Sequence, residues 1–254
     1  MTVVLCLVLG AGIGMVLGGL GGGGAVLAVP ALFYVVGQTA HEAATGSLIV
    51  VGLSAAVALV VPARAGLVRW RTGAVVAASG AGTAALGALL SPLIPARVEL
   101  LALACVMAAC GVGLLLRGRV PTRPPAAPGT TGAATLARTL AVGAAVGFLT
   151  GLLGVGGGFL IVPALVLAVR MPMRVATGTS IFVTAVNCAA ALGPRLAGAH
   201  LDWAVIGPFS AAAIGGAVLG ARVGARVSGP ALSRAFAALV LAVASFTALH
   251  TLAT

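Results

Sequence analysis

Two glycine-rich stretches interrupt strongly apolar parts of this sequence: GGLGGGGAVLAVPAL at residues 18–32 and GLLGVGGGFLIVPAL at residues 151–165. In a helix interior, a glycine costs about 1 kcal/mol relative to alanine and a proline about 3 kcal/mol. Both stretches are therefore predicted to end one helix and begin another. A helix that begins there presents free N–H groups and a partial positive charge, which together can bind an anion. The candidate anion-binding residues are Gly21, Gly22, Gly23, Gly24, Gly154, Gly156, Gly157 and Gly158.

A second interpretation is that the glycines only let helices approach closely, as in GxxxG pairs. This interpretation explains the glycines that are spaced by four, which are Gly10, Gly14 and Gly18 in one stretch and Gly143, Gly147 and Gly151 in the other. It does not explain four consecutive glycines followed by a proline. The sequence therefore favours a binding role for the breaks themselves.

Polar residues begin the segment that follows each break. Hydroxyl and amide groups on a membrane helix can donate hydrogen bonds to sulfonate or carboxylate oxygens, or they can cap the helix and bond to its own backbone. We predict substrate binding by Thr45, Ser47, Thr177, Thr179, Ser180 and Asn187. His41, Glu42 and Arg174 stand at the membrane interface and are candidates for coupling to protons, although Arg174 can also serve only to orient the chain.

The sequence offers no pattern typical of catalysis or of cofactor binding. No Ser/His/Asp set, HExxH motif or carboxylate pair lies within the apolar segments. LGAGIGMVLG has Met15 in place of the third glycine of a dinucleotide loop, and no acidic residue follows about 20 positions later. The four cysteines lack metal-ligand spacing and are expected to pack between helices. We expect no enzyme activity, no cofactor and no metal.

The elements that carry these residues must span a membrane. Hydrophobic residues make up 61% of the 254 residues and charged residues 7%, and the mean hydropathy is +1.24. Soluble domains are about 25% charged. Several uncharged stretches exceed the roughly 18 residues that mark a membrane-spanning candidate. The net charge of +11 comes from arginines between these stretches, which indicates contact with anionic lipid rather than nucleic acid.

The chain is one module used twice. Residues 10–32 align with 143–165 at an offset of 133 residues, and EAATGSLIV (42–50) matches RVATGTSIFV (174–183) with one residue inserted. A linker rich in Pro, Gly, Thr and Arg spans residues 117–138, between a first transmembrane repeat at 1–116 and a second at 139–254. The predicted segments are 2–20, 25–38, 42–62, 70–92 and 97–116, then 136–153, 158–170, 175–194, 203–222 and 231–252.

Arginine placement indicates how the two repeats are oriented. If each broken element crosses the membrane once, the arginines divide almost evenly between the two sides. If the short second segment counts as a crossing, all arginines except Arg97 and Arg195 lie on the linker side, which fits the positive-inside rule. Five crossings per repeat invert the second repeat relative to the first, as in many secondary transporters. We therefore predict an all-α membrane protein of two inverted repeats, with both termini outside the cytoplasm.

The sequence resembles the sulfite exporter TauE/SafE family of membrane transporters. The resemblance rests on GLGGGGAVLAVPAL and GLLGVGGGFLIVPAL, on the downstream ATGS and ATGTS elements, and on the repeat length. It implies export of sulfite, or of a small organosulfonate such as sulfoacetate, across a bacterial inner membrane. The implied partners are the small anion and the bilayer, and the oligomeric state stays open. A passive anion channel and a transporter of another small organic anion are the alternatives.

Overall fold

The computed structural model describes residues 2–22, 24–117, 133–154, 157–196 and 202–253. This part of the chain is helical throughout, without β-strands. The helices are α1 (Thr2–Leu20), α2 (Ala25–Pro30), the π-helix η1 (Ala31–Val35), α3 (Ala40–Ala58), α4 (Val60–Arg64), α5 (Trp70–Leu90), the 3-10 helix η2 (Ser91–Leu93), α6 (Ala96–Arg117), α7 (Ala133–Leu153), α8 (Gly158–Leu167), α9 (Met173–Leu196), α10 (Trp203–Gly224) and α11 (Gly229–Ala253).

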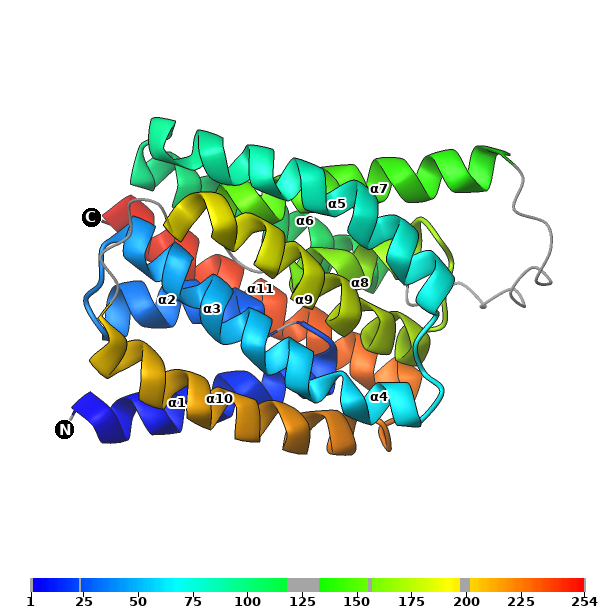
Figure 1. Cartoon of the computed structure of the whole chain (residues 1–254), viewed down its shortest axis with the longest axis horizontal. Helices are drawn as coiled ribbons and strands as arrows, with labels where there is room; N and C mark the ends of the chain where they lie inside the picture. Colours follow the sequence, from blue (N-terminus) through cyan, green and yellow to red (C-terminus); the bar gives the residue numbers. More distant parts are fainter. Residues whose placement is uncertain (1, 23, 118–132, 155–156, 197–201, 254) are drawn as a thin grey trace.

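The long helices run side by side along the longest axis of the molecule (Figure 1). Seven of the described helical segments are long and apolar enough to cross a membrane, and three shorter apolar segments accompany them, Leu5–Leu20, Ala25–Val35 and Gly158–Leu167. The two chain termini lie at one end of the bundle, whereas α7 begins at the opposite end (Figure 1). The chain is thus a multi-pass membrane protein.

Most expected segments match a helix to within a few residues, with two informative differences. Helix α7 begins at Ala133, so the last residues of the expected linker are helical. The second segment of the first half is a short α-helix that continues as a π-helix after Pro30. A proline inside a helix removes one backbone donor and disturbs the preceding turn, and this accounts for the wider turn that follows it.

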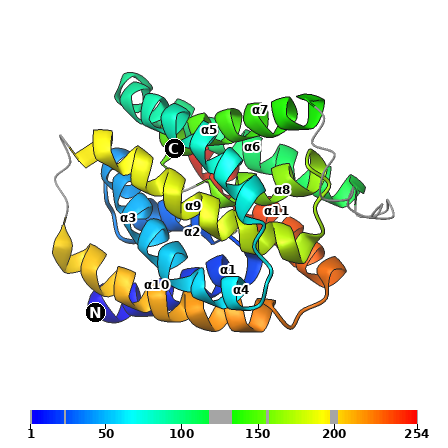
Figure 2. The ribbon, with the colours of Figure 1, turned by 45° about the vertical axis from the view of Figure 1, so that its right-hand side comes forward.

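Each half packs its first long helix against the other half. Helix α1 lies along α10, and α7 lies along α5, at opposite edges of the molecule (Figures 1 and 2). Helices α3 and α9 contact each other between these pairs, and α6 contacts α11. Elements at equivalent places in the two sequence repeats therefore make equivalent contacts.

Glycines make the two edge pairs possible. A methyl group added to Gly14 would lie 2.0 Å from the Ala213 carbonyl oxygen, and one added to Gly147 would lie 2.1 Å from the Gly80 carbonyl oxygen. The close-packing interpretation is therefore confirmed for the glycines spaced by four. The offset of 133 residues relates Gly14 to Gly147 and Gly80 to Ala213, so the same contact occurs twice.

Candidate functional site

Both glycine-rich stretches end a helix in the middle of the bundle. Gly21 and Gly154 follow the last residues of α1 and α7 and have φ angles of +69° and +64°. A residue with positive φ just beyond a helix end is a common stop signal, and glycine adopts it without steric cost. The Gly22 N–H donates to the Leu17 carbonyl at 2.8 Å, and the Gly154 N–H donates to the Thr150 carbonyl at 3.0 Å. The predicted breaks are thus confirmed in both halves.

The two breaks are in direct backbone contact. A methyl group added to Gly22 would lie 2.4 Å from Gly158 Cα, and one added to Gly158 would lie 2.5 Å from Gly22 Cα. No side chain fits between them, so glycine is required at both positions. Gly21, Gly22, Gly24, Gly154, Gly157 and Gly158 are all buried, while Gly23 and Gly156 lie outside the described residues.

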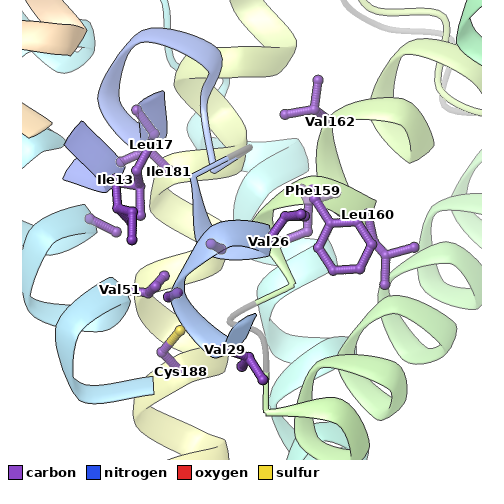
Figure 3. Close-up of a cluster of buried hydrophobic side chains, with 14 of the residues drawn as sticks. Ile13, Leu17, Val26, Val29, Val51, Phe159, Leu160, Val162, Ile181 and Cys188 are labelled. Atoms are coloured by element: carbon purple, nitrogen blue, oxygen red, sulfur yellow. The ribbon is translucent and has the colours of Figure 1, made fainter. Parts of the chain in front are cut away.

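Apolar side chains surround this contact (Figure 3). Val26 of α2 and Phe159 of α8 are fully buried, as are Leu17 and Ile181 beside them. Electrostatic interactions are stronger in such an environment than in water, because little solvent screens them. The first N–H groups of α8 therefore begin in a setting of low polarity, where an anion would gain most from them.

Two predicted site residues hold the breaks in place across the halves. The Ser47 hydroxyl donates to the Gly154 carbonyl, and the Ser180 hydroxyl donates to the Gly21 carbonyl. The offset of 133 residues relates both the serines and the glycines, without the inserted residue that the sequence match requires. Each half therefore fixes the glycine break of the other half by one serine.

The three predicted threonines are buried and already have hydrogen-bond partners. Thr45 and Thr177 donate to the backbone carbonyls of His41 and Met173, four residues earlier in their own helices, at 2.9 Å and 2.8 Å. Thr179 accepts a hydrogen bond from the Arg69 N–H at 3.0 Å, at the start of α5. These bonds support the helices, and a hydroxyl that donates to its own helix can turn to a ligand.

The candidate coupling residues lie at two different ends of the bundle. His41 and Glu42 begin α3, where the Glu42 carboxylate accepts hydrogen bonds from Thr39 N and Oγ1 at 3.0 Å and 2.8 Å in a capping box. Arg174 begins α9 and donates to the Ala225 carbonyl at the end of α10. The structure thus separates Arg174 from His41 and Glu42.

A pocket lies near each end of the bundle. Arg174, Thr177 and Gly178 help to line one pocket, between α1, α9 and α10. Glu99 and Ala44 help to line the other, between α2, α3, α6 and α7. The described glycines of the two breaks line neither pocket. In this conformation the breaks are therefore enclosed between the two pockets.

Two buried polar residues on α9 escaped the sequence analysis. Thr184 is fully buried, and its Oγ1 atom would lie 2.9 Å from a methyl group on Gly158. Arg195, at the end of the same helix, is 2% exposed and donates to the Gly151 and Leu152 carbonyls at 2.7 Å and 2.9 Å. It also pairs with Glu99 at 3.7 Å. Their helical spacing from Thr177 and Ser180 is the signal that could have revealed both.

Asn187, which the sequence did single out, is the predicted site residue whose polar atoms have no partner within the described part of the chain. Both its Oδ1 and its Nδ2 are buried. The side chain lies against Gly80 of α5, since a methyl group there would be 2.9 Å from each of these atoms. Most buried polar groups have a partner. Asn187 is therefore free to bind a ligand.

Comparison with known proteins defines the class to which this fold and site belong. The family model described as "Sulfite exporter TauE/SafE" matches residues 6–247. The chain belongs to this family of membrane transporters.

Two curated relatives carry the printed name "Probable membrane transporter protein". One, from Xylella fastidiosa strain 9a5c, is 37% identical over 239 residues, which cover 92% of this chain and 90% of the relative. The other, from Xylella fastidiosa strain Temecula1, is 39% identical over 170 residues, which cover 66% of this chain and 64% of the relative. No solved structure matches the chain with significance.

Proposed function

We propose that this transporter exports a small anion, sulfite or a small organosulfonate, from the cytoplasm across the inner membrane. The anion binds at the two glycine breaks, near the middle of the membrane, where the helices that follow each break begin. The observation that carries this proposal is the backbone contact between Gly22 and Gly158. Two interrupted helices meet there, away from water, and helix N-termini are built to bind negative charge.

We further propose that the halves are inverted repeats. Helices α1 and α7 begin at opposite ends of the bundle (Figure 1). The serine bonds from Ser47 to Gly154 and from Ser180 to Gly21 relate the halves by the same exchange. In inverted-repeat transporters, broken helices place the substrate where the repeats meet. With the arginine-rich end in the cytoplasm, the pocket beside Arg174 faces inward and the pocket beside Glu99 faces outward.

The membrane potential is a sufficient driving force for this export. An anion that leaves a cell with a negative interior gains about 2.3 kcal/mol per charge per 100 mV. The capping role of Glu42 also gives that carboxylate a structural purpose apart from proton transfer. Uncoupled, potential-driven efflux is therefore the mechanism we propose.

Flux through purified protein in liposomes tests the proposal. Sulfite, sulfoacetate, sulfate, lactate and chloride are loaded singly, and efflux is followed at a set potassium diffusion potential. We expect saturable efflux of sulfite or sulfoacetate, accelerated by an outside-positive potential, together with counterflow. Flux without saturation or counterflow would show a channel instead, and transport of lactate alone would assign a different organic anion.

A further inference from the structure

Helix α9 carries a buried polar face along its whole length. Thr177, Ser180, Thr184, Asn187 and Arg195 are all buried. At about 100° per residue, these five positions fall within a sector about 80° wide. The face passes the pocket beside Arg174, then both glycine breaks, and ends at Arg195 near the other end of the bundle.

The middle of this face points into the start of α8. Thr184 Oγ1 lies against Gly158, the first residue of α8, and has no hydrogen-bond partner in the described residues. Asn187, one turn further along α9, also has both polar side-chain atoms unpartnered and buried. Leaving such groups unpaired in an apolar interior costs free energy. Here the unpaired groups stand beside a helix N-terminus, where an anion would satisfy them.

The matching face of α3 does not offer the same groups. At the offset of 133 residues, Val51 stands opposite Thr184 and Ser54 opposite Asn187. The α2 helix that follows the first break is also only six residues long, whereas α8 has ten. The second half is therefore the better binding half.

We propose that the anion moves along the polar face of α9, and that Thr184 and Asn187, with the N-terminus of α8, form its central binding position. This inference rests on the proposed function and assigns the site to one half. The ligand class is a small oxyanion, a sulfonate, sulfite or carboxylate, whose oxygens accept hydrogen bonds from the Thr184 hydroxyl, the Asn187 amide and the first N–H groups of α8. Arg174 stands at one end of the path, and Arg195 stands at the other.

Arg195 is suited to the far end of this path because part of its guanidinium is unused. Its Nη2 atom donates to the Gly151 and Leu152 carbonyls, while Nε and Nη1 are buried without a partner in the described residues. A guanidinium with two free donors can receive an oxyanion that leaves the centre. Glu99, 3.7 Å away, balances its charge between transport events.

Four variants of the purified protein test the central position, with sulfite and sulfoacetate as probes in calorimetric binding. Thr184→Val removes the hydroxyl at nearly constant volume, and Asn187→Leu removes the amide. We expect each to weaken binding by roughly tenfold or more, because a hydrogen bond to a charged group is lost. Thr184→Ser keeps the hydroxyl and should bind like the wild type. Thr247→Val removes another buried, unpartnered hydroxyl, on α11, and should also bind like the wild type.

Wild-type affinity in both Thr184→Val and Asn187→Leu would overturn the inference while leaving the proposed function intact. A wild-type protein that binds neither probe nor any anion of the flux panel would overturn the proposed function, and this inference with it. Equal losses in Thr184→Val and Thr247→Val would assign the loss to general packing and also overturn the inference. If Thr184→Val does not yield folded protein, Asn187→Leu against Thr184→Ser decides.

Discussion

Helices α3 and α9 occupy equivalent places in the two halves, yet their buried faces differ. Both carry a serine that bonds to the glycine break of the other half, Ser47 on α3 and Ser180 on α9. Beyond this shared serine, α9 has a threonine at 184 where α3 has Val51, and a buried arginine at 195 where α3 has Pro62. The duplicated backbone builds the breaks twice, whereas the polar groups that can bind a ligand gather in one half.

The largest expected effect concerns the shared scaffold, and it should be equal in the two halves. Gly14→Val and Gly147→Val each force a side chain against a backbone carbonyl of the opposite half, at positions where even a methyl group would approach to 2.0 Å and 2.1 Å. Overpacking of this kind costs about 1–3 kcal/mol or more. We expect both variants to lose most of their monodisperse protein in detergent size-exclusion chromatography.

Gly12→Val and Gly82→Val are the matched controls, because nothing lies within 4 Å of a methyl group at either position. They should elute like the wild type. A severe defect in only one of Gly14→Val and Gly147→Val would show that the two edge pairs are not equivalent in strength.

The second prediction concerns the charge that only the second half contains. Arg195→Ala leaves Glu99 without its cation and frees the two carbonyls at the end of α7. Removing one partner of a buried ion pair costs about 3–5 kcal/mol. We expect a clear drop in the thermal unfolding temperature of the purified protein, with a much smaller drop for Arg174→Ala, whose side chain is exposed. Equal melting of the two variants would contradict the role of Arg195 at the end of α7.

The third prediction compares two unpartnered polar side chains at equivalent places. Asn187→Leu should weaken sulfite or sulfoacetate binding by roughly tenfold, whereas Ser54→Ala should change it by less than about twofold. Both side chains are buried, and neither has a partner in the described residues. Titration calorimetry on the two variants makes the comparison. A stronger loss in Ser54→Ala would move the binding position to the first half.

The smallest effect is expected at the serines that the halves share. Ser47→Ala and Ser180→Ala each remove one buried hydrogen bond to a glycine carbonyl of the other half. Such a bond contributes about 1 kcal/mol. We expect similar, modest drops in unfolding temperature for the two variants, measured by intrinsic fluorescence. Wild-type melting of one variant and a large drop for the other would break the equivalence of the two breaks.

Much of this architecture could be predicted from the sequence because backbone breakers leave a strong local signal. Consecutive glycines and a nearby proline marked where α2 and α8 begin, and the glycines spaced by four marked the close contacts of α1 and α7. The short repeat match around ATGS was less reliable. It aligned the motif letter by letter with one inserted residue, whereas the hydrogen bonds relate Ser47 to Ser180 directly.

The side chains that face the breaks were harder to predict. Thr184 stands alone among apolar residues in the sequence, and it gains meaning only when α8 begins beside it. Arg195 follows a proline near a helix end, where an arginine usually faces the membrane interface. Its burial depends on the carbonyls at the end of α7 and on Glu99, which are distant in the sequence. Such contacts between distant segments cannot be read from local patterns.

An experimental structure of the protein with bound sulfoacetate would test the central claim most directly. The account predicts density for the anion at the start of α8, within hydrogen-bond distance of the Thr184 hydroxyl and beside the contact between Gly22 and Gly158. Density for the anion only at an end of the bundle, with the two glycine breaks still packed against each other in every conformation observed during transport, would contradict it.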